Sequence, residues 1–299
     1  MDMDLVFLGT GGSAPTARRS TACLLARVGG ERLLFDCGEG SQRQMQRSTG
    51  LVQVDEIYVS HLHADHSLGI PGLLKTYDLN GRERPLRVIG PPGLFELFKA
   101  LRRIFGRLGY EVDLVELDPG EAVRHDGYEV RSFEVEHRMR AFGYALVEDE
   151  RPGRFDPEAA QRLGVSPGPA FKRLQDGDTV DGSGGAVTPA QVMGEGRPGR
   201  KLVISGDTAP CEMTRVAAHG GQLLVHDSSF AELAEHGDLG LGTLNALDGE
   251  MIALDGRFYR ADVDGLIDEI PCEERTPFAA VAWFEASLEH HLQLSLIHI

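Results

Sequence analysis

The sequence predicts a layered α/β fold, and three observations support this prediction. The chain has 299 residues, of which 41% are hydrophobic, so it can build the core of one large domain or two ordinary ones. Short apolar segments closed by glycine-containing turns alternate with segments that have the composition of helices. No internal repeat of fixed period is apparent. Strands with helices between them are typical of sheets covered by helices.

The expected elements follow one another at ordinary lengths. Apolar runs bounded by turn residues predict strands at 5–12, 22–28, 32–38, 85–91, 112–117, 128–137, 141–149, 200–208 and 223–230. Another strand begins at 55 and opens into a loop rich in histidine and aspartate that extends to 66. Helices are expected at 40–50, 68–79, 93–109 and 212–221. Residues 149–180, rich in Pro, Gly and charge, predict an excursion from the core with one short helix.

The charge balance bears on the choice of partner. A formal net charge of −16 argues against a nucleic-acid partner, because Lys and Arg supply most of the affinity for phosphates. Residues 238–299, however, hold 12 Asp and Glu against 3 Lys and Arg, so the acidity is concentrated at this end. In the rest of the chain, basic residues gather at 18–19, 82–87, 99–107, 172–173 and 197–201. A local basic surface is therefore compatible with the composition.

The sequence also argues against several classes of protein. No apolar run reaches the roughly 18 residues that a membrane-spanning helix needs. The first residues are acidic, whereas a signal peptide begins with basic residues. The cysteines lie far apart without a CxxC pair, which disfavours a disulfide framework and a thiolate zinc site. We expect a soluble, cytoplasmic protein without a membrane partner.

The strongest chemical signal is the segment HLHADH, which directly follows the apolar strand. Three histidines and one aspartate fall within it: His61, His63, Asp65 and His66. Such a cluster at a strand end is costly unless a cation binds there, and these side chains are ligands for zinc or a similar divalent ion. Strand alternation would place His61 and His63 on one side, while Asp65 and His66 can turn toward a second centre.

Two further candidate ligands close other predicted strands. His137 ends the segment YEVRSFEVEH, and Asp207 lies near the end of KLVISGDT. Alone, a histidine at a strand end is more often a hydrogen-bonded surface residue. Together with HLHADH, however, the two residues complete two metal shells at a shared rim of the sheet. A carboxylate such as Asp207 can bridge two ions, as in two-metal hydrolases.

Residues 1 to about 237 resemble the ribonuclease Z family, the transfer-RNA 3′-processing endonucleases of the metallo-β-lactamase superfamily. The resemblance rests on FLGTGGSAPT, LLFDCGEGSQRQM, SHLHADHSLGIPGLL, VEHRMRAFGY, PGPAFKRLQDG, SGDT and HDSSF, in the family's order. The HxHxDH loop alone indicates only the superfamily. The resemblance implies a metallo-β-lactamase αββα sandwich as the fold. It also implies an enzyme that removes the 3′ trailer of precursor tRNA by phosphodiester hydrolysis.

The resemblance also implies two zinc ions and the residues that hold them. His61, His63 and His137 match the ligands of one ion. Asp65 and His66 match those of the other ion, and Asp207 matches the bridge. Asp65 further matches the residue assigned as proton acceptor.

A protruding arm and a dimer follow from the same resemblance. The excursion at about 149–180 corresponds to an arm that grips transfer RNA, with Lys172 and Arg173 as the expected phosphate contacts. The family acts as a homodimer in which the arm of one subunit serves the site of the other. We therefore expect precursor tRNA and a second copy of the chain as partners.

The pattern departs from the family after residue 237. The family continues with a His-Ser-Thr motif and ends in a strand whose histidine completes the second zinc shell, whereas position 238 is Asp here. Residues 238 to about 285 resemble an N-terminal part of α-acetolactate decarboxylase through LGLGT, ALDGEM and LDGRFY. This resemblance brings no complete site, because the histidines that bind zinc in that family lie further along its chain. A carboxylate such as Glu250 would then have no metal to act with.

The final segment LSLIHI, residues 294–299, has two interpretations. It is either a degenerate closing strand with His298 as the last zinc ligand, or the translation of a transposon-end sequencing adapter. We favour the adapter. The chain then comprises a metallo-β-lactamase domain at 1–237, a decarboxylase-like fragment at 238–293 and a non-native tail at 294–299, as in an assembly chimera.

The expected activity of such a chain is weak or absent, and other functions compete with tRNA processing. One is a small-ester or cyclic-phosphate hydrolase of the same superfamily, which would not need the excursion at 149–180. A second is a non-catalytic RNA-binding or misfolded product, which would hold no metal. The third is acetolactate decarboxylation by the C-terminal fragment.

Overall fold

The computed structural model describes residues 2–17, 19–209 and 211–227, together with strand segments at 250–254, 257–261, 267–269 and 296–298. The chain divides into two compact units. The larger unit comprises Met1–Arg124, Val130–Leu146 and Lys201–Ile299. The smaller unit comprises His125–Glu129 and Val147–Arg200.

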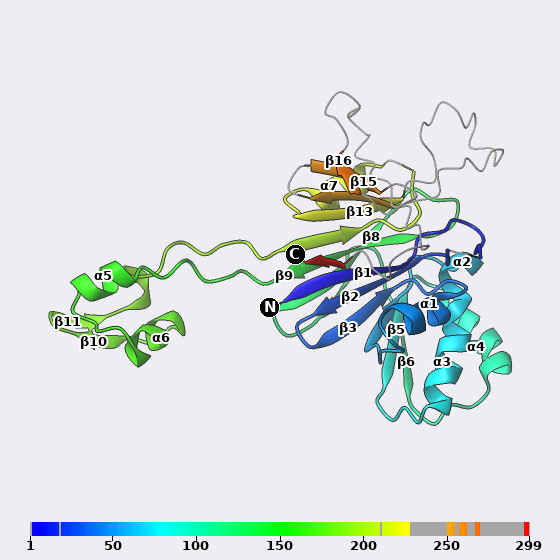
Figure 1. Cartoon of the computed structure of the whole chain (residues 1–299), viewed down its shortest axis with the longest axis horizontal. Coiled ribbons are helices and arrows are strands. Elements are labelled where there is room, and N and C mark those ends of the chain that lie inside the picture. The colour runs from blue at the N-terminus through cyan, green and yellow to red at the C-terminus, as the bar shows by residue number, and fades with distance from the viewer. Residues whose placement is uncertain are drawn as a thin grey trace. The chain divides into compact units, whose positions relative to one another are not determined.

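The first sheet has seven strands, and its first half is antiparallel (Figure 1). In spatial order the strands are β17 (Leu296–His298), β1 (Met3–Gly9), β2 (Cys23–Val28), β3 (Glu31–Phe35), β4 (Glu56–Tyr58), β5 (Leu86–Gly90) and β6 (Val112–Glu116). The neighbours from β3 to β6 are parallel. Strand β1 is buried at six of its seven positions, as expected of a strand covered on both faces.

Helices cover one face of this sheet and form the main hydrophobic core. They are α1 (Ser41–Ser48), the short α2 (Ala64–Ser67), α3 (Gly69–Leu79) and α4 (Leu94–Phe105). Apolar residues three and four positions apart on α3, including Ile70, Leu73 and Leu74, are fully buried in this core. On the strand side the core includes Ile57 and Val88. The predicted helices at 40–50, 68–79 and 93–109 are therefore present with slightly shorter bounds.

The second sheet has eight strands and packs against the uncovered face of the first. In spatial order they are β16 (Ile267–Glu269), β15 (Arg257–Ala261), β14 (Glu250–Leu254), β13 (Leu223–Asp227), β12 (Lys201–Ile204), β9 (Phe142–Glu148), β8 (Tyr128–Glu134) and β7 (Ala122–Arg124). The ring of Tyr144 on β9 lies 5.9 Å from that of Phe35 and 5.3 Å from that of Tyr58. Its hydroxyl donates to the carbonyl of Val59 at 2.7 Å. Helix α7 (Glu212–Ala218) connects β12 to β13.

The C-terminal part of the chain contributes strands to both sheets. Strand β14 pairs with β13 in antiparallel register, and β17 pairs with β1 so that His298 lies opposite Asp4. Glu250 begins β14. Most of the predicted fragment at 238–293, including its junction at 235–238, lies outside the described residues. The tail at 294–299 is described only at 296–298.

The smaller unit has its own hydrophobic core. Its elements are α5 (Pro157–Arg162), α6 (Pro169–Gln175), β10 (Val180–Gly182), β11 (Gly185–Val187) and the 3₁₀ helix η1 (Pro189–Gln191). Six buried side chains form the core: Ala160, Val165, Leu174, Val180, Val187 and Val192. The prediction of one short helix at 149–180 is wrong, because α5 and α6 both form there. Pro169 occupies the first turn of α6, where a missing N–H costs nothing.

Several strands end earlier than the sequence predicts. Strand β4 ends at Tyr58, β8 at Glu134 and β12 at Ile204, although the predicted strands continue through the polar residues beyond them. The candidate ligands therefore lie past the strand ends, in loops or, for Asp65 and His66, in the short helix α2. None of the described helices is long and apolar enough to cross a membrane.

Candidate metal centre

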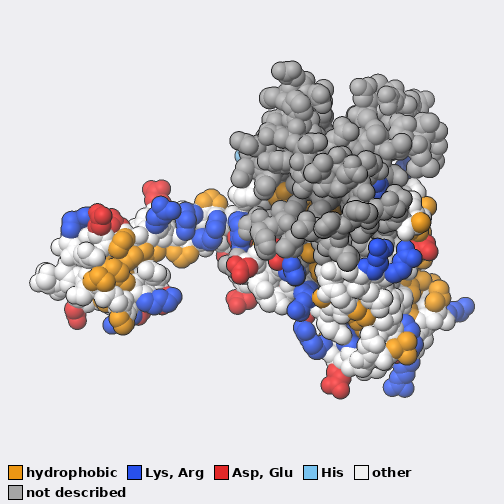
Figure 2. Space-filling view, in the orientation of Figure 1, with side chains coloured by type: hydrophobic (Ala, Val, Ile, Leu, Met, Phe, Trp, Pro, Cys, Tyr) orange, Lys and Arg blue, Asp and Glu red, His pale blue; other side chains and the backbone are white. Residues whose placement is uncertain are grey.

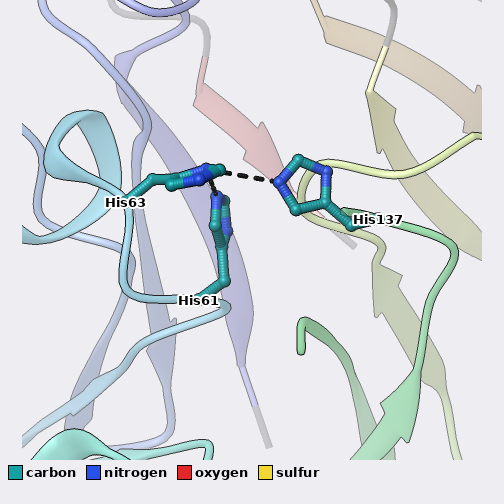
Figure 3. A group of neighbouring side chains, drawn as sticks. All are labelled: His61, His63 and His137. Carbon is teal, nitrogen blue, oxygen red and sulfur yellow. Dashed lines mark hydrogen bonds between the residues drawn. The ribbon is translucent and has the colours of Figure 1, made fainter. Parts of the chain in front are cut away.

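Three histidines from two segments converge at one end of the sandwich (Figure 3). Nε2 of His61 lies 2.8 Å from Nδ1 of His63, and Nε2 of His137 lies 3.3 Å from the same atom. Two nitrogens that are each 2.0–2.1 Å from a tetrahedral zinc ion lie roughly 3.3 Å apart. The spacing of this first cluster therefore fits three ligands of one ion.

A second cluster shares His61 with the first. Nε2 of His66 lies 3.2 Å from Oδ1 of Asp207, and Nε2 of His61 lies 4.0 Å from Oδ2 of the same carboxylate. Among the described residues, these are the two groups of three whose ligand atoms come close enough to hold a metal ion. The two oxygens of Asp207 face different histidines, which is the orientation that a bridging carboxylate needs.

Asp36 orients His66 from behind. Its Oδ2 lies 2.7 Å from Nδ1 of His66, and the backbone N–H and the hydroxyl of Ser60 donate to the same carboxylate at 2.7 and 2.8 Å. A carboxylate on the far nitrogen fixes the ring, so that Nε2 faces the metal position. Sequence reasoning did not identify Asp36. A signal was present, since Asp36 directly follows the apolar end of β3, as the candidate ligands follow other strands.

The electrostatics of the second cluster favour a positive charge between its members. Burial disfavours the charged form of His66, but Asp207 and Asp36 outweigh burial and raise the pKa of His66 well above its usual value. Burial would raise the pKa of Asp207, yet His66, His61 and His137 hold it below its usual value. Two carboxylates around one buried imidazole thus stabilise a cation, and a divalent ion supplies the same charge.

The imidazole rings of His61 and His137 are uncharged, as metal ligands must be. Burial, followed by the neighbouring His66, lowers the pKa of His61 to about 2. Burial also lowers the pKa of His137. A metal ion binds the unprotonated nitrogen of imidazole, so both rings are ready to act as ligands at neutral pH.

Glycines allow the loops of the first sheet to pack closely around the histidines. A Cβ on Gly38 would lie 1.9 Å from the carbonyl oxygen of Asp65, and a Cβ on Gly69 would lie 2.2 Å from that of Gly38. The N–H of Cys37 donates to the carbonyl of His66 at 2.9 Å. The backbone around 36–40 therefore fixes the segment 61–69, because only glycine fits at both contacts.

The second sheet delivers His137 and Asp207 through two linked loops. Glu136 and Ala209 form an isolated bridge, in which the N–H of Ala209 donates to the carbonyl of Glu136 at 2.8 Å. Gly206 has a left-handed φ of 62°, and a Cβ there would lie 2.9 Å from the Cβ of Ser60. This turn brings Asp207 against the loop that carries the other histidines.

Comparison with curated proteins identifies close relatives over most of the chain. A ribonuclease Z from Methanosarcina acetivorans is 49% identical over 255 residues, which cover 84% of this chain and 82% of the relative. A ribonuclease Z from Methanosarcina mazei is 49% identical over 232 residues, or 76% of this chain and 75% of the relative. The chain belongs to the ribonuclease Z family. The resemblance predicted from the sequence motifs is thus confirmed.

Family models and solved structures add two further findings. The model for alpha-acetolactate decarboxylase matches residues 220–298, which agrees with the predicted C-terminal fragment, and the model for the anti-Pycsar protein Apyc1 matches residues 3–151. The structure of Zn²⁺-bound PqqB from Methylobacterium extorquens is 12% identical, with a TM-score of 0.50 over 80% of this chain and 77% of that one. This member of the ribonuclease Z family has the metallo-β-lactamase fold, as predicted.

Asp65, one of the two residues expected at the second ion, lies outside both clusters. Its Oδ2 is 3.8 Å from Nε2 of His66. His63 directly precedes α2, and Asp65 and His66 follow within that helix. Successive residues of a helix point about 100° apart, so the side chains of Asp65 and His66 leave α2 in different directions.

Lys172 and Arg173, expected to contact phosphate, each have an acidic partner within the smaller unit. Both side chains are exposed on α6. Nζ of Lys172 lies 2.7 Å from Asp176, and Nε of Arg173 lies 3.3 Å from Asp178. Their charges are therefore partly neutralised in this structure.

Proposed function

We propose that the chain is a metal-dependent endoribonuclease that removes the 3′ trailer of precursor tRNA by phosphodiester hydrolysis. Membership of the ribonuclease Z family supports the reaction. The observation that carries the proposal is the convergence of His61, His63, His66, His137 and Asp207 in two overlapping clusters.

We assign two zinc ions to these clusters. His61, His63 and His137 would hold one ion, Asp65 and His66 the other, and Asp207 would bridge them. When bound, such ions polarise a phosphodiester and lower the pKa of water, so that hydroxide is available to attack the phosphorus. The carboxylate of Asp65, whose side chain is 15% exposed, would accept a proton from the attacking water.

The smaller unit would serve as the arm that binds transfer RNA, and Lys172 and Arg173 would contact phosphates after exchanging their acidic partners for the RNA. We further propose that the chain acts as a homodimer in the cytoplasm, with the arm of one subunit serving the site of the other. The exposed position of the Lys172 and Arg173 side chains on α6 supports the proposed contacts with phosphates.

We expect the activity of this chain to be weak or absent. The family's closing histidine and His-Ser-Thr motif have no equivalent in the residues that match the family, so the second ion would lack a ligand. In the structure, β17 occupies the edge beside β1, and it carries His298. If residues 294–299 are a translated adapter, His298→Ala should leave the zinc content of the chain unchanged. If His298 is instead a zinc ligand, the same substitution should lower the zinc content.

Cleavage of a precursor tRNA by the purified chain tests the proposal. The N–H of Glu148 donates to the carbonyl of Arg200 at 2.9 Å, so a short glycine linker can replace residues 149–199. This deletion should abolish cleavage of precursor tRNA and preserve hydrolysis of bis(p-nitrophenyl) phosphate. If the intact chain hydrolyses the small ester and leaves precursor tRNA uncut, the proposal fails.

A second candidate is another hydrolase of the same fold, acting on a small ester or a cyclic phosphate. The match of residues 3–151 to the Apyc1 model favours this candidate, because it covers HLHADH but not the main part of the smaller unit. Such an enzyme should retain its activity after the same deletion.

A further inference from the structure

Helix α4 begins against the metal-binding loop. Its N-cap, Gly93, has a left-handed φ of 105°, and a Cβ there would lie 3.0 Å from Cδ1 of Leu62, the residue between His61 and His63. The carboxylate of Glu116 accepts hydrogen bonds from the N–H groups of Gly93 and Phe95, both at 2.9 Å. The start of α4 is therefore fixed relative to the first histidine cluster.

The opposite end of α4 carries positive charge. The helix buries Leu94, Phe98 and Leu101, whereas Arg102 and Arg103 are exposed in its last turn. Arg107 follows just beyond the helix and is also exposed. Figure 2 shows Lys and Arg side chains projecting over the region of α3 and α4.

These three arginines differ from the other basic residue on the helix. Lys99 pairs with Glu96 at 3.4 Å. Arg102, Arg103 and Arg107 form no ion pair with any residue in the described part of the chain. Three exposed guanidinium groups lie within six residues and have no acidic partner there, so they are available to bind an anion.

The length of the helix sets the distance between this basic end and the metal centre. From Leu94 to Arg103 the helix rises about 14 Å, at 1.5 Å per residue. An RNA phosphodiester at the metal centre would therefore place part of the adjoining double helix near the arginines. A guanidinium group can bind phosphate through two parallel hydrogen bonds.

We propose that Arg102, Arg103 and Arg107 bind backbone phosphates of the double-helical stem of the RNA substrate, while its 3′ end reaches the metal centre. This inference rests on the proposed function. Basic residues in a last turn also stabilise the helix dipole. That role alone predicts a change in thermal stability and none in RNA binding.

The test measures binding of a 3′-extended precursor tRNA to the full chain by fluorescence anisotropy at several salt concentrations. The variant is Arg102→Gln/Arg103→Gln/Arg107→Gln, and the matched control is Glu96→Gln/Lys99→Gln on the same helix. Loss of three phosphate contacts should make the negative slope of log K against log salt less steep by about 2.7. The affinity lost between 50 and 200 mM salt should then shrink by about 40-fold.

The control variant should keep the wild-type slope and should hydrolyse bis(p-nitrophenyl) phosphate at the wild-type rate. An unchanged slope in the triple variant would overturn the inference while leaving the proposed function intact. If the wild-type chain binds precursor tRNA without cleaving it, the proposed function fails and the slope still decides the inference. Absence of RNA binding by the wild-type chain would refute both.

Discussion

The carboxylate of Asp36 accepts hydrogen bonds from the backbone N–H and the hydroxyl of Ser60 and contacts the ring of His66, all within 2.8 Å. It binds no metal in the proposed scheme and acts as a positioning residue. The sequence singled out the candidate ligands because their residue types are unusual just past strand ends. It did not reveal Asp36, because the pairing of one carboxylate with one ring 30 residues away depends on how β3 and β4 pack.

Replacing Asp36 by Asn tests this positioning role. The amide of Asn has one acceptor oxygen, so Nδ1 of His66 or Ser60 loses its partner. We expect affinity for zinc to fall by about 10- to 100-fold, as for other residues that support metal ligands. A competition titration with a chelator of known affinity measures it.

The exposed pair of Arg87 and Asp113 supplies the control, since Asp113→Asn removes a carboxylate whose side chain is 54% exposed. Zinc affinity should be unchanged in this control. Equal affinities of Asp36→Asn and the wild-type chain would show that Asp36 does not position His66.

At the scale of elements, the sequence predicted the order of strands and helices well, because apolar periodicity and glycine stops are local signals. Two of its failures have a clear physical reason. The excursion at 149–180 forms both α5 and α6, each of which begins with proline, a residue that is common in turns as well as in the first turn of a helix. Asp65 lies in the short helix α2, and four residues carry too little periodicity to reveal it.

Close contact between loops predicts the effect of adding a methyl group at a glycine. Gly69→Ala would force a Cβ to within 2.2 Å of the carbonyl oxygen of Gly38. We expect a loss of about 3 kcal/mol in the free energy of unfolding, together with weaker zinc binding. Chemical denaturation and zinc titration measure the two effects.

Gly30→Ala is the matched substitution, because a Cβ on Gly30 has no atom within 4 Å and its φ is not left-handed. It should leave zinc affinity unchanged. A Gly69→Ala chain with normal stability and zinc content would mean that the loops around 36–40 and 61–69 are not held together as the structure describes.

At the scale of the whole molecule, the division into two units follows from two separate hydrophobic cores, which the sequence did not indicate at 149–180. The smaller unit is closed at its ends by the pair of Glu148 and Arg200, whose side chains are 4% and 15% exposed. Nε and the backbone N–H of Arg200 donate to Glu148 at 2.8 and 3.0 Å.

This pair gives the smaller unit a stability that depends on pH. The hydrogen bond from the Arg200 side chain holds the pKa of Glu148 below its usual value of 4.5. The stabilisation is therefore complete above that value and is lost as the pH falls through the lower pKa of the folded state. We expect Glu148→Gln to cost about 3 kcal/mol at pH 7 and to flatten the pH dependence below about pH 5.

Hydrogen exchange of amides in 147–200 at several pH values reports the local stability. Glu158→Gln removes an exposed carboxylate from the same unit and should have little effect. Equal protection in the wild-type chain and Glu148→Gln across this pH range would exclude the pair as a stabilising contact.

Elemental analysis of the dialysed, full-length chain and of two variants tests the central claim most directly. The wild-type chain should retain zinc, up to two equivalents. His137→Ala should remove the ion of the first cluster, whereas His61→Ala should remove both, because His61 belongs to both clusters. A folded wild-type chain without metal, or a His61→Ala chain with the wild-type zinc content, would contradict the account.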